Sequence, residues 1–132
     1  MTLPWSPCNF GSIASSIALG RGSLAYSAAK GGVVQLTRET AYAWANRNIR
    51  VNSILRCQFV NEGWSIALED LERAEVVKRV NSGIPLGRMG QPAEIVGRVL
   101  FLAAEASAMV TGIVLPVDGG NLAMNAGASV DW

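Results

Sequence analysis

Tyr26 and Lys30 are the pair of side chains in this sequence best suited to proton transfer. They stand four residues apart in the run YSAAK. On a helix, residues at this spacing share a face about one turn apart. An ammonium group beside a phenol favours the phenolate, so the pair can exchange a proton with an alcohol or carbonyl oxygen near neutral pH. A packed tyrosine and a solvated lysine produce the same spacing, and the motif alone leaves both interpretations open.

The segment from Leu24 to Trp44 is predicted to be the helix that holds this pair. Its buried face is expected to carry residues spaced by three and four: Ala29, Val33, Leu36, Thr40 and Trp44. Gly31 and Gly32 each cost a helix about 1 kcal/mol relative to alanine, so we expect another backbone to approach closely there. Asn46 and Asn48 supply a left-handed end to the helix.

Two short apolar strands and two further helices are predicted beyond this helix. The strands are expected at 50–55 and 113–117, and an amphipathic helix is expected over 65–80. A loop rich in glycine and proline at 84–91 precedes a helix that begins at Pro92. The order is helix, strand, helix, helix, strand, and the strands are too apolar to face water. This pattern predicts an α/β fold whose parallel sheet is covered on both faces.

The first eight residues are predicted to contain no regular element. Pro4 and Pro7 argue against a central strand, and no helical period is present. The start MTLPWSPCNF also lacks the charged and then apolar stretches of a signal peptide. We expect one domain over 1–132 with an atypical amino terminus at 1–8.

The composition excludes several classes of function. Eleven basic and ten acidic residues leave a net charge of +1, which argues against a nucleic-acid partner and a basic membrane anchor. No apolar run reaches about 18 residues, so no membrane span is expected. Histidine is absent, which excludes triads that use imidazole. Cys8 and Cys57 form no C-x-x-C pair, so we expect neither a zinc site nor a disulfide, and a cytoplasmic location.

Several stretches of the sequence resemble the short-chain dehydrogenase/reductase family: NFGSIAS, GRGSLAYSAAKGGVVQLTRETA, NIRVNSI, IPLGRMGQPAEI and VLFLAAEASAMVTGIVLPVDGG. The resemblance runs in register from about Asn9 to Leu122. It implies an NAD(P)-dependent oxidoreductase that transfers a hydride between nicotinamide and a secondary alcohol or ketone. The most similar members are 3-oxoacyl-[acyl-carrier-protein] reductases and gluconate or sugar-alcohol dehydrogenases.

The resemblance also implies roles for individual residues. Tyr26 would be the acid/base, and Lys30 would assist it electrostatically and hold the ribose hydroxyls of the nicotinamide nucleotide. The family's serine, which holds the substrate oxygen, falls on Ser12. The number of residues between Ser12 and Tyr26 is one greater than usual in the family, so Ser15 and Ser16 remain alternatives.

The segment after the first predicted strand departs from the family. The family has P-G-x-x-x-T where this chain has R-C-Q-F-V-N. Phe59 can still wall the nicotinamide and Asn61 can offer an amide hydrogen bond, so both are candidate cofactor-binding residues. Arg56 lacks the fixed φ of proline, and Cys57 carries a side chain where glycine is expected. For Cys57 we expect a small, partly buried thiol.

The cofactor-binding half of the family's fold has no counterpart in the sequence. No glycine-rich turn of the type G-x-x-x-G-x-G or G-x-G-x-x-G stands between a strand and a helix. The resemblance therefore implies the carboxyl-terminal part of a Rossmann-like, doubly wound parallel sheet that lacks the amino-terminal dinucleotide-binding half. The expected cofactor is NAD or NADP, but we expect the chain alone to be inactive. Residues 65–83 correspond to the family's substrate lid, and their charges are typical of a solvated helix face.

The resemblance also leads us to expect partners. The substrate would be a small alcohol or ketone. A homo-oligomer is expected through the helix over 24–46, and its contact residues would be Val33, Leu36, Ala41 and Trp44. A half-sheet also presents an open strand edge and apolar surface, both of which favour association. The alternative function is therefore a non-catalytic chain that associates with itself or with a complementing fragment.

Overall fold

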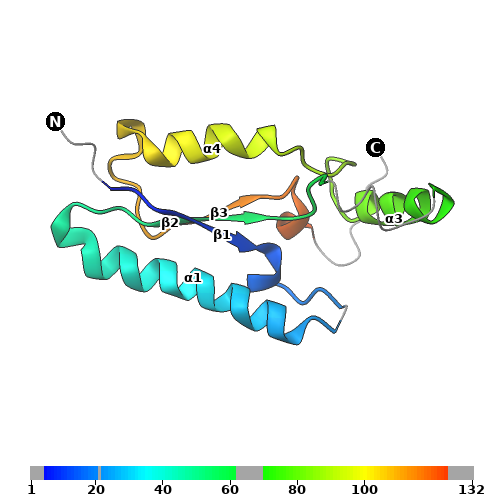
Figure 1. Ribbon diagram of the computed structural model, residues 1–132, viewed down its shortest axis with the longest axis horizontal. Helices are drawn as coiled ribbons and strands as arrows, with labels where there is room; N and C mark the ends of the chain where they lie inside the picture. The colour runs from blue at the N-terminus through cyan, green and yellow to red at the C-terminus, as the bar shows by residue number, and fades with distance from the viewer. Residues whose placement is uncertain (1–4, 21, 62–69, 125–132) are drawn as a thin grey trace.

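A parallel sheet between two helices forms the centre of the computed structural model, which describes residues 5–20, 22–61 and 70–124. The strands pair in the order β1, β2, β3, with the bounds Cys8–Ser12, Asn52–Arg56 and Val114–Val117. Helix α1 (Leu24–Trp44) covers one face of the sheet and α4 (Ala93–Ala103) covers the other (Figure 1). The predicted α/β fold with a covered parallel sheet is confirmed.

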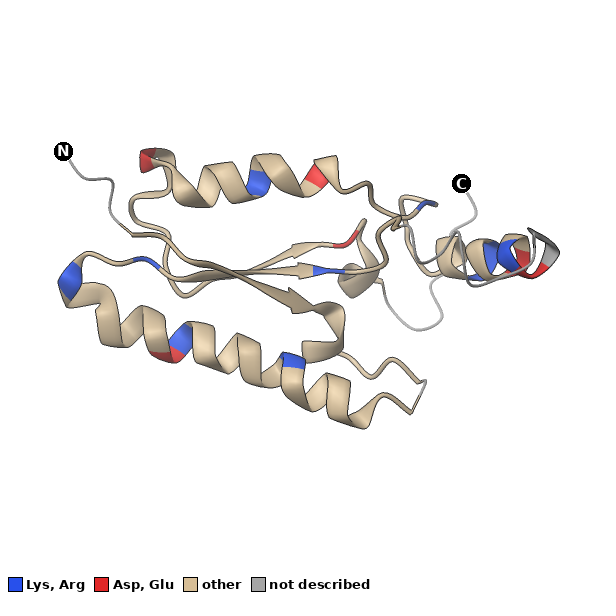
Figure 2. Ribbon diagram, viewed as in Figure 1, with Lys and Arg blue, Asp and Glu red and all other residues tan. Residues whose placement is uncertain are grey.

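The remaining elements connect or extend this centre. Helix α3 (Asp70–Ser82) projects from one end of the molecule (Figure 1). Short 3₁₀ helices complete the description: η1 (Ile13–Ser15), η2 (Ala45–Arg47), η3 (Glu105–Ser107) and η4 (Asn121–Ala123). The helix predicted at 65–80 is thus observed from residue 70, and residues 65–69 lie outside the described residues. Residues of both charge signs are concentrated on α3, as Figure 2 shows.

Strand β2 is the central strand, and its side chains form the core. Ile54 and Leu55 are fully buried, as is Val51 just before the strand. Phe10 of β1 pairs with Ile54, and Gly11 pairs with Leu55. A Cβ atom at Gly11 would collide with the Leu55 side chain, so the packing of Leu55 against β1 depends on glycine. The strand predicted at 50–55 is confirmed with a shift of its bounds.

Strand β1 begins at Cys8, the last of the eight residues predicted to contain no regular element, and it corrects that prediction at this residue. The prolines argued only against a central strand, and β1 has no second neighbour in the described part of the chain. Pro7 lies just before the strand, where its missing N–H is not needed. Its carbonyl still accepts a hydrogen bond of 3.1 Å from the Asn52 N–H. An edge strand tolerates proline at such a position.

The buried face of α1 is also different from the predicted one. Val34, Thr37 and Ala41 are buried, whereas the predicted Leu36 is 56% exposed. Thr37 can be buried because its hydroxyl donates a hydrogen bond to the Val33 carbonyl (2.8 Å) and accepts one from the Asn9 amide (3.0 Å). A search for apolar periodicity does not count a threonine that is buried because its hydrogen bonds are formed within the protein. The predicted buried face was therefore displaced by one residue along the helix.

The two ends of α1 agree better with the sequence. The helix begins at Leu24 and ends at Trp44, as predicted, and Asn48 adopts the left-handed conformation with a φ of 57°. The expected close backbone at Gly31 and Gly32 is absent from the described residues, since no atom beyond the chain neighbours and the helix's own backbone lies within 4 Å of a Cβ at either position. The helix cost of these glycines is therefore not offset within the chain.

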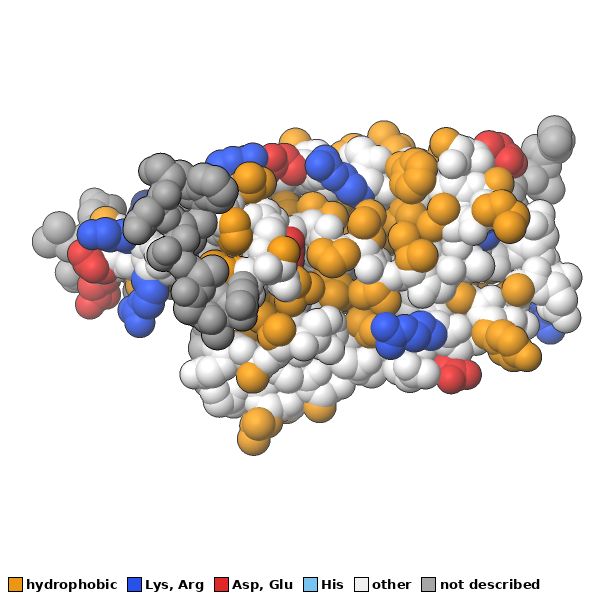
Figure 3. All heavy atoms as spheres, turned by 180° about the vertical axis from the view of Figure 1, so that it is seen from behind, with side chains coloured by type: hydrophobic (Ala, Val, Ile, Leu, Met, Phe, Trp, Pro, Cys, Tyr) orange, Lys and Arg blue, Asp and Glu red, His pale blue; other side chains and the backbone are white. Residues whose placement is uncertain are grey.

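None of the helices in the described residues is both long and apolar enough to cross a bilayer. The view from behind instead shows hydrophobic side chains gathered between the two covering helices, over the side of the sheet formed by β3 (Figure 3). In the described sheet, β3 is the edge strand opposite β1. The apolar surface in Figure 3 lies at this edge.

Arg50 ties the start of β2 to the end of α4. Its side chain is buried, and its guanidinium donates hydrogen bonds to the carbonyls of Leu102 (2.8 Å), Ala104 (3.3 Å) and Val110 (3.1 Å). These contacts span more than 50 residues of sequence. They hold the segment before β3 in place beside β2.

Replacing Arg50 by methionine is expected to lower the free energy of unfolding by about 2 kcal/mol, because the acceptors at Leu102, Ala104 and Val110 lose a charged donor. Urea unfolding followed by circular dichroism measures the change. Arg47→Met, at an exposed position three residues earlier, is the matched control and should leave the urea midpoint unchanged. Equal midpoints for the two variants would contradict the structural role given to Arg50.

Candidate active site

Tyr26 and Lys30 lie on one face of α1, in its first two turns. The Lys30 Nζ is 5.9 Å from the centre of the Tyr26 ring, and Tyr26 is 45% exposed. The expected juxtaposition of a phenol and an amine is therefore present. An exposed phenol at the start of a helix is accessible to a small molecule.

Lys30 donates a hydrogen bond to the sheet. Its ammonium group donates to the backbone carbonyl of Phe10 in β1, at 2.9 Å. This contact joins α1 to the strand from the side of the open sheet edge. It also holds the ammonium group where the Tyr26 ring is its neighbour.

A cavity of about 260 Å³ brings four of the five predicted site residues together: Ser12, Tyr26, Phe59 and Asn61. Lys30 is not part of its lining. The cavity lies at the carboxyl ends of β1 and β2 and at the amino-terminal end of α1. In open α/β sheets this end of the strands is where ligands bind.

Ser12 lines this cavity, and its Oγ accepts a hydrogen bond from the backbone. The residue is 6% exposed and caps η1, where its Oγ accepts a hydrogen bond from the Ala14 N–H at 3.2 Å. The hydroxyl hydrogen can therefore still be donated to a group in the cavity. The alternatives do not share this position. The Ser15 hydroxyl donates to the Ser12 carbonyl (2.6 Å), and neither Ser15 nor Ser16 lines the cavity.

Phe59 forms a fixed wall because Gly90 lies against it. The two residues form an isolated parallel bridge, and a Cβ at Gly90 would come within 2.5 Å of the Phe59 ring. The N–H of Val60 donates to the Gly90 carbonyl at 2.9 Å. Gly90 is thus a residue that positions the site and that motif reasoning missed. In the sequence, Gly90 was visible only as one glycine of the loop predicted at 84–91.

The two departures from the family pattern lie beside the same cavity. Arg56 is the last residue of β2, and Cys57 follows it with a half-buried thiol. Burial, and then the negative charge of Asp118, raise the pKa of the Cys57 thiol. The group is therefore protonated at neutral pH, as expected for a small partly buried thiol and not for a nucleophile.

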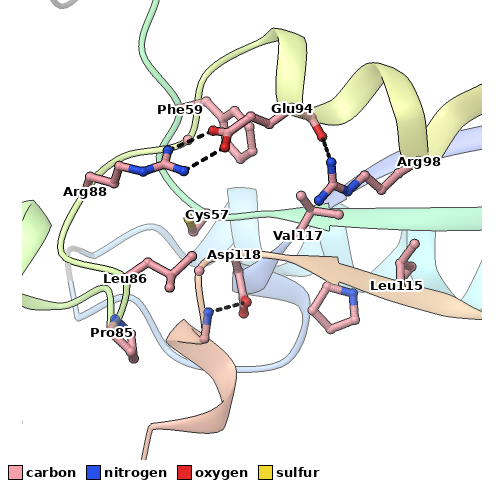
Figure 4. Close-up of a pocket in the computed structure, with 14 residues that line it drawn as sticks. Cys57, Phe59, Pro85, Leu86, Arg88, Glu94, Arg98, Leu115, Val117 and Asp118 are labelled. Atoms are coloured by element: carbon pink, nitrogen blue, oxygen red, sulfur yellow. Dashed lines mark hydrogen bonds and ion pairs between the residues drawn. The ribbon is translucent and has the colours of Figure 1, made fainter.

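A larger cavity of about 520 Å³ lies under α4, and its charged side chains are held by one ion pair and by hydrogen bonds to the backbone (Figure 4). The Arg88 guanidinium donates to both Glu94 carboxylate oxygens, at 2.8 and 2.7 Å, and Arg98 donates to the Glu94 carbonyl at 2.7 Å. Asp118 accepts from the Gly120 N–H at 3.0 Å. The groups suited to proton transfer are in the smaller cavity, so we assign the candidate site there.

Comparisons with known proteins show the family to which the chain belongs. The profile of the family described as enoyl-(acyl carrier protein) reductase matches residues 6–121. The galactitol 2-dehydrogenase (L-tagatose-forming) of Cereibacter sphaeroides is 43% identical over 72% of this chain and 36% of its own length. The 3-oxoacyl-[acyl-carrier-protein] reductase FabG of Thermotoga maritima is 39% identical over 75% of this chain and 38% of its own length.

Solved structures show the same relationship. An oxidoreductase of the short-chain dehydrogenase/reductase family from Burkholderia thailandensis superposes with a TM-score of 0.79 at 30% identity, over 89% of this chain and 45% of that one. A protein assigned as an NAD(P)-dependent gluconate 5-dehydrogenase from Beutenbergia cavernae, with bound NADP, superposes with a TM-score of 0.76 at 39% identity, with the same coverage.

The chain belongs to the short-chain dehydrogenase/reductase family of NAD(P)-dependent oxidoreductases. It spans less than half of the length of the relatives named above. This coverage is consistent with the expectation that it represents one part of the family's Rossmann-like sheet.

The Arg88–Glu94 pair beside the larger cavity is expected to persist into strong acid. The pKa of Glu94 is lowered to about 2, mainly because its carboxylate accepts hydrogen bonds from Arg88 and then from the Gln91 N–H. A carboxyl whose pKa is lowered on folding stabilises the fold above its unfolded pKa of about 4.3. That contribution is lost as the pH falls through the folded value. The pair should therefore stay closed from neutral pH to about pH 3.

A ¹³C NMR titration of the Glu94 side chain measures this midpoint directly. The variant Arg88→Gln should move the midpoint upward, toward that of an ordinary glutamate, because it removes the largest cause of the shift. A Glu94 midpoint that is the same in the unsubstituted chain and in the variant would refute the pairing.

Proposed function

We propose that this chain supplies the proton-transfer part of an oxidoreductase that exchanges a hydride between NAD or NADP and a secondary alcohol or ketone. The observation that carries the proposal is the meeting of the Tyr26 phenol and the Ser12 hydroxyl at one cavity, at the carboxyl ends of two parallel strands. Two oxygen-bearing groups that converge on one small space can hold the single oxygen of an alcohol or a ketone.

In this mechanism Tyr26 moves the proton and Ser12 positions the oxygen. During reduction the Tyr26 O–H donates its proton to the substrate oxygen, and during oxidation the phenolate oxygen accepts it back. Ser12 donates a hydrogen bond to the same oxygen, and it has a hydrogen to give because its Oγ acts as an acceptor toward Ala14. Lys30 lies one turn along the helix, with its Nζ 5.9 Å from the centre of the Tyr26 ring.

The residues around the cavity fit one end of the dinucleotide. The Phe59 ring offers a flat apolar wall, and Asn61 lines the same cavity. The cofactor, when bound, would supply or remove the hydride. The glycine-rich turn that cradles the pyrophosphate has no counterpart in this sequence. We therefore propose that the nicotinamide end contacts this chain and that another polypeptide segment holds the adenosine end.

The role of Tyr26 can be tested because the chain has only two tyrosines, Tyr26 and Tyr42. The full chain would be co-expressed with the part of the C. sphaeroides galactitol 2-dehydrogenase that lies outside the match. Galactitol oxidation would then be followed with NAD and with NADP. Tyr26→Phe should lower kcat by about 10²–10⁴-fold, which is the range for loss of a general acid/base. Tyr42→Phe, at an almost fully exposed position, should leave the rate unchanged.

The chain alone is the baseline for that experiment. Without a pyrophosphate-binding turn it is expected to show no saturable micromolar binding of NADH or NADPH when nicotinamide fluorescence is followed. Micromolar binding by the chain alone would contradict the division of the cofactor site. A Tyr26→Phe complex with undiminished turnover would refute the proton-transfer role.

The second candidate function is non-catalytic self-association through the outer face of α1. Leu36 and Trp44 are exposed there, although Ala41, which was predicted to join them, is buried in the core and cannot take part. The space beside Gly31 and Gly32 would also allow a second backbone to approach closely. These observations favour a helix-to-helix contact between copies of the chain.

Light scattering at a chain concentration of tens of micromolar distinguishes a self-associated chain from a monomer. The chain is expected to form a dimer or larger assembly, and Leu36→Glu is expected to shift it toward monomer by placing a charge in an apolar contact. Met109→Glu is the matched control, since Met109 is exposed but lies outside α1. A chain that is monomeric before substitution would eliminate this candidate.

A further inference from the structure

Arg56 ends the central strand of the sheet, at the edge of the candidate site. In the strand register it pairs with Ser12 of β1 on one side and with Val117 of β3 on the other. Its side chain is exposed, whereas the side chain of Leu55 just before it is 1% exposed. Arg56 therefore contributes little to the core, although its main chain is held between two neighbouring strands.

Arg56 is also the single charged side chain among the described residues that line the cavity of Tyr26 and Ser12. The other polar side chains of this lining carry hydroxyl, amide and thiol groups. A ligand in the cavity therefore meets one permanent positive charge and, within the described lining, no carboxylate. Such a surface favours an anionic ligand over a neutral or cationic one.

The Arg56 guanidinium forms no hydrogen bond or ion pair within the described part of the chain. Asp118 lies close enough for its charge to act on the Cys57 thiol, but its carboxylate is already used. One oxygen accepts from the Gly120 N–H (3.0 Å) and the other from the Leu122 N–H (2.9 Å). An ion pair among the described residues thus does not account for this arginine. A guanidinium matches carboxylates and phosphates because it presents two parallel N–H donors.

We propose that Arg56 binds the carboxylate of the substrate, so that this site takes a small hydroxy acid or the corresponding oxo acid. The inference rests on the proposed function, because it names the substrate class of the same cavity. The alcohol or ketone oxygen lies at Tyr26 and Ser12, and the carboxylate accepts hydrogen bonds from the guanidinium. Ser12 and Arg56 are partners on strands about 4.8 Å apart, so a short molecule reaches both.

The size of the cavity limits the length of this acid. Its volume of about 260 Å³ is below the range of about 300–1,000 Å³ typical of pockets for drug-sized ligands. Arg56, Phe59 and Asn61 also line an apolar groove of about 460 Å³ between β1 and α4, but the other described residues of that groove are apolar. A hydroxy acid therefore finds partners for both its hydroxyl and its carboxylate in the smaller cavity.

A second arginine borders the neighbouring space. Arg79 of α3 lines a cavity of about 450 Å³ that shares Ile13, Leu19 and Gln58 with the cavity of Tyr26. It is exposed, like Arg56, but it does not line the cavity of Tyr26 itself. Arg79 is therefore the alternative partner for an anion, and its substitution is the matched control.

Binding of matched acids and amides tests the inference on the full chain without turnover. The probes are lactate and 3-hydroxybutyrate, and each is compared with its uncharged amide, lactamide or 3-hydroxybutyramide. Binding is followed through the backbone N–H NMR signals of Ser12 and Phe59. Each acid is expected to bind at least about tenfold more tightly than its amide, because the amide cannot form the charged hydrogen bonds.

Three variants assign this preference to one side chain. Arg56→Gln should weaken binding of the acids at least about tenfold and leave the amides within about twofold. Arg56→Lys should keep part of the preference, because it keeps the charge but not the planar pair of donors. Arg79→Gln should change the affinity of the acids by less than about twofold.

The phosphate of the nicotinamide nucleotide is a second source of negative charge. Nicotinamide mononucleotide, titrated in the same way, is expected to bind the unsubstituted chain and Arg56→Gln with affinities within about twofold of each other. A variant that loses the mononucleotide and keeps the acids would assign Arg56 to the phosphate and would overturn the proposal.

Three further results would overturn it: no saturable binding of either acid, equal binding of acid and amide, or a preference that survives Arg56→Gln. Turnover is measured separately, in the complex co-expressed with the part of the C. sphaeroides enzyme outside the match. Acids that bind through Arg56 but are not oxidised support the inference and count against the proposed function. Oxidation of galactitol by a complex that shows no preference for the acids supports the proposed function and rejects the inference.

Discussion

The parallel pairing of β1 with β2 is the interaction on which the rest of the described structure depends. Its register sets Phe10 beside Ile54 and Ser12 beside Arg56, so that both strands end at the same level. The end of β1 delivers Ser12, and the end of β2 leads directly into Cys57 and Phe59. Only because these ends coincide can a serine and a phenylalanine more than 40 residues apart line one cavity with Tyr26.

Buried polar contacts then hold the helices in place on this sheet. Thr37 and Asn9 tie α1 to β1, and the Arg50 guanidinium ties the end of α4 to the start of β2. Such contacts are directional, and a buried partner left without its hydrogen bond costs about 1–3 kcal/mol. They therefore fix the position of a helix along the sheet. Apolar packing alone fixes this position less precisely, because it is not directional. The position of Tyr26 above the strand ends follows from this placement.

Prediction from the sequence succeeded where a signal is local and failed where a signal depends on neighbours. The bounds of α1 followed from its period and from the asparagines after it. Strand β1 was missed because two nearby prolines argue against a strand, and they are tolerated only because β1 lies at an edge. The buried face of α1 was misplaced because Thr37 is polar, and its burial depends on Asn9, 28 residues earlier. Gly90 was overlooked because its requirement is set by the distant ring of Phe59.

The sequence by itself determined that a phenol and an amine share one face of a long helix, that the fold is α/β, and that imidazole chemistry is excluded. These properties depend on residue type, on spacing within one element and on composition. Only the tertiary structure decided that Ser12, and not Ser15 or Ser16, faces the cavity of Tyr26, and that Lys30 is bound to the Phe10 carbonyl. Those choices depend on strand register and on an open sheet edge, and both arise from contacts between segments far apart in the chain.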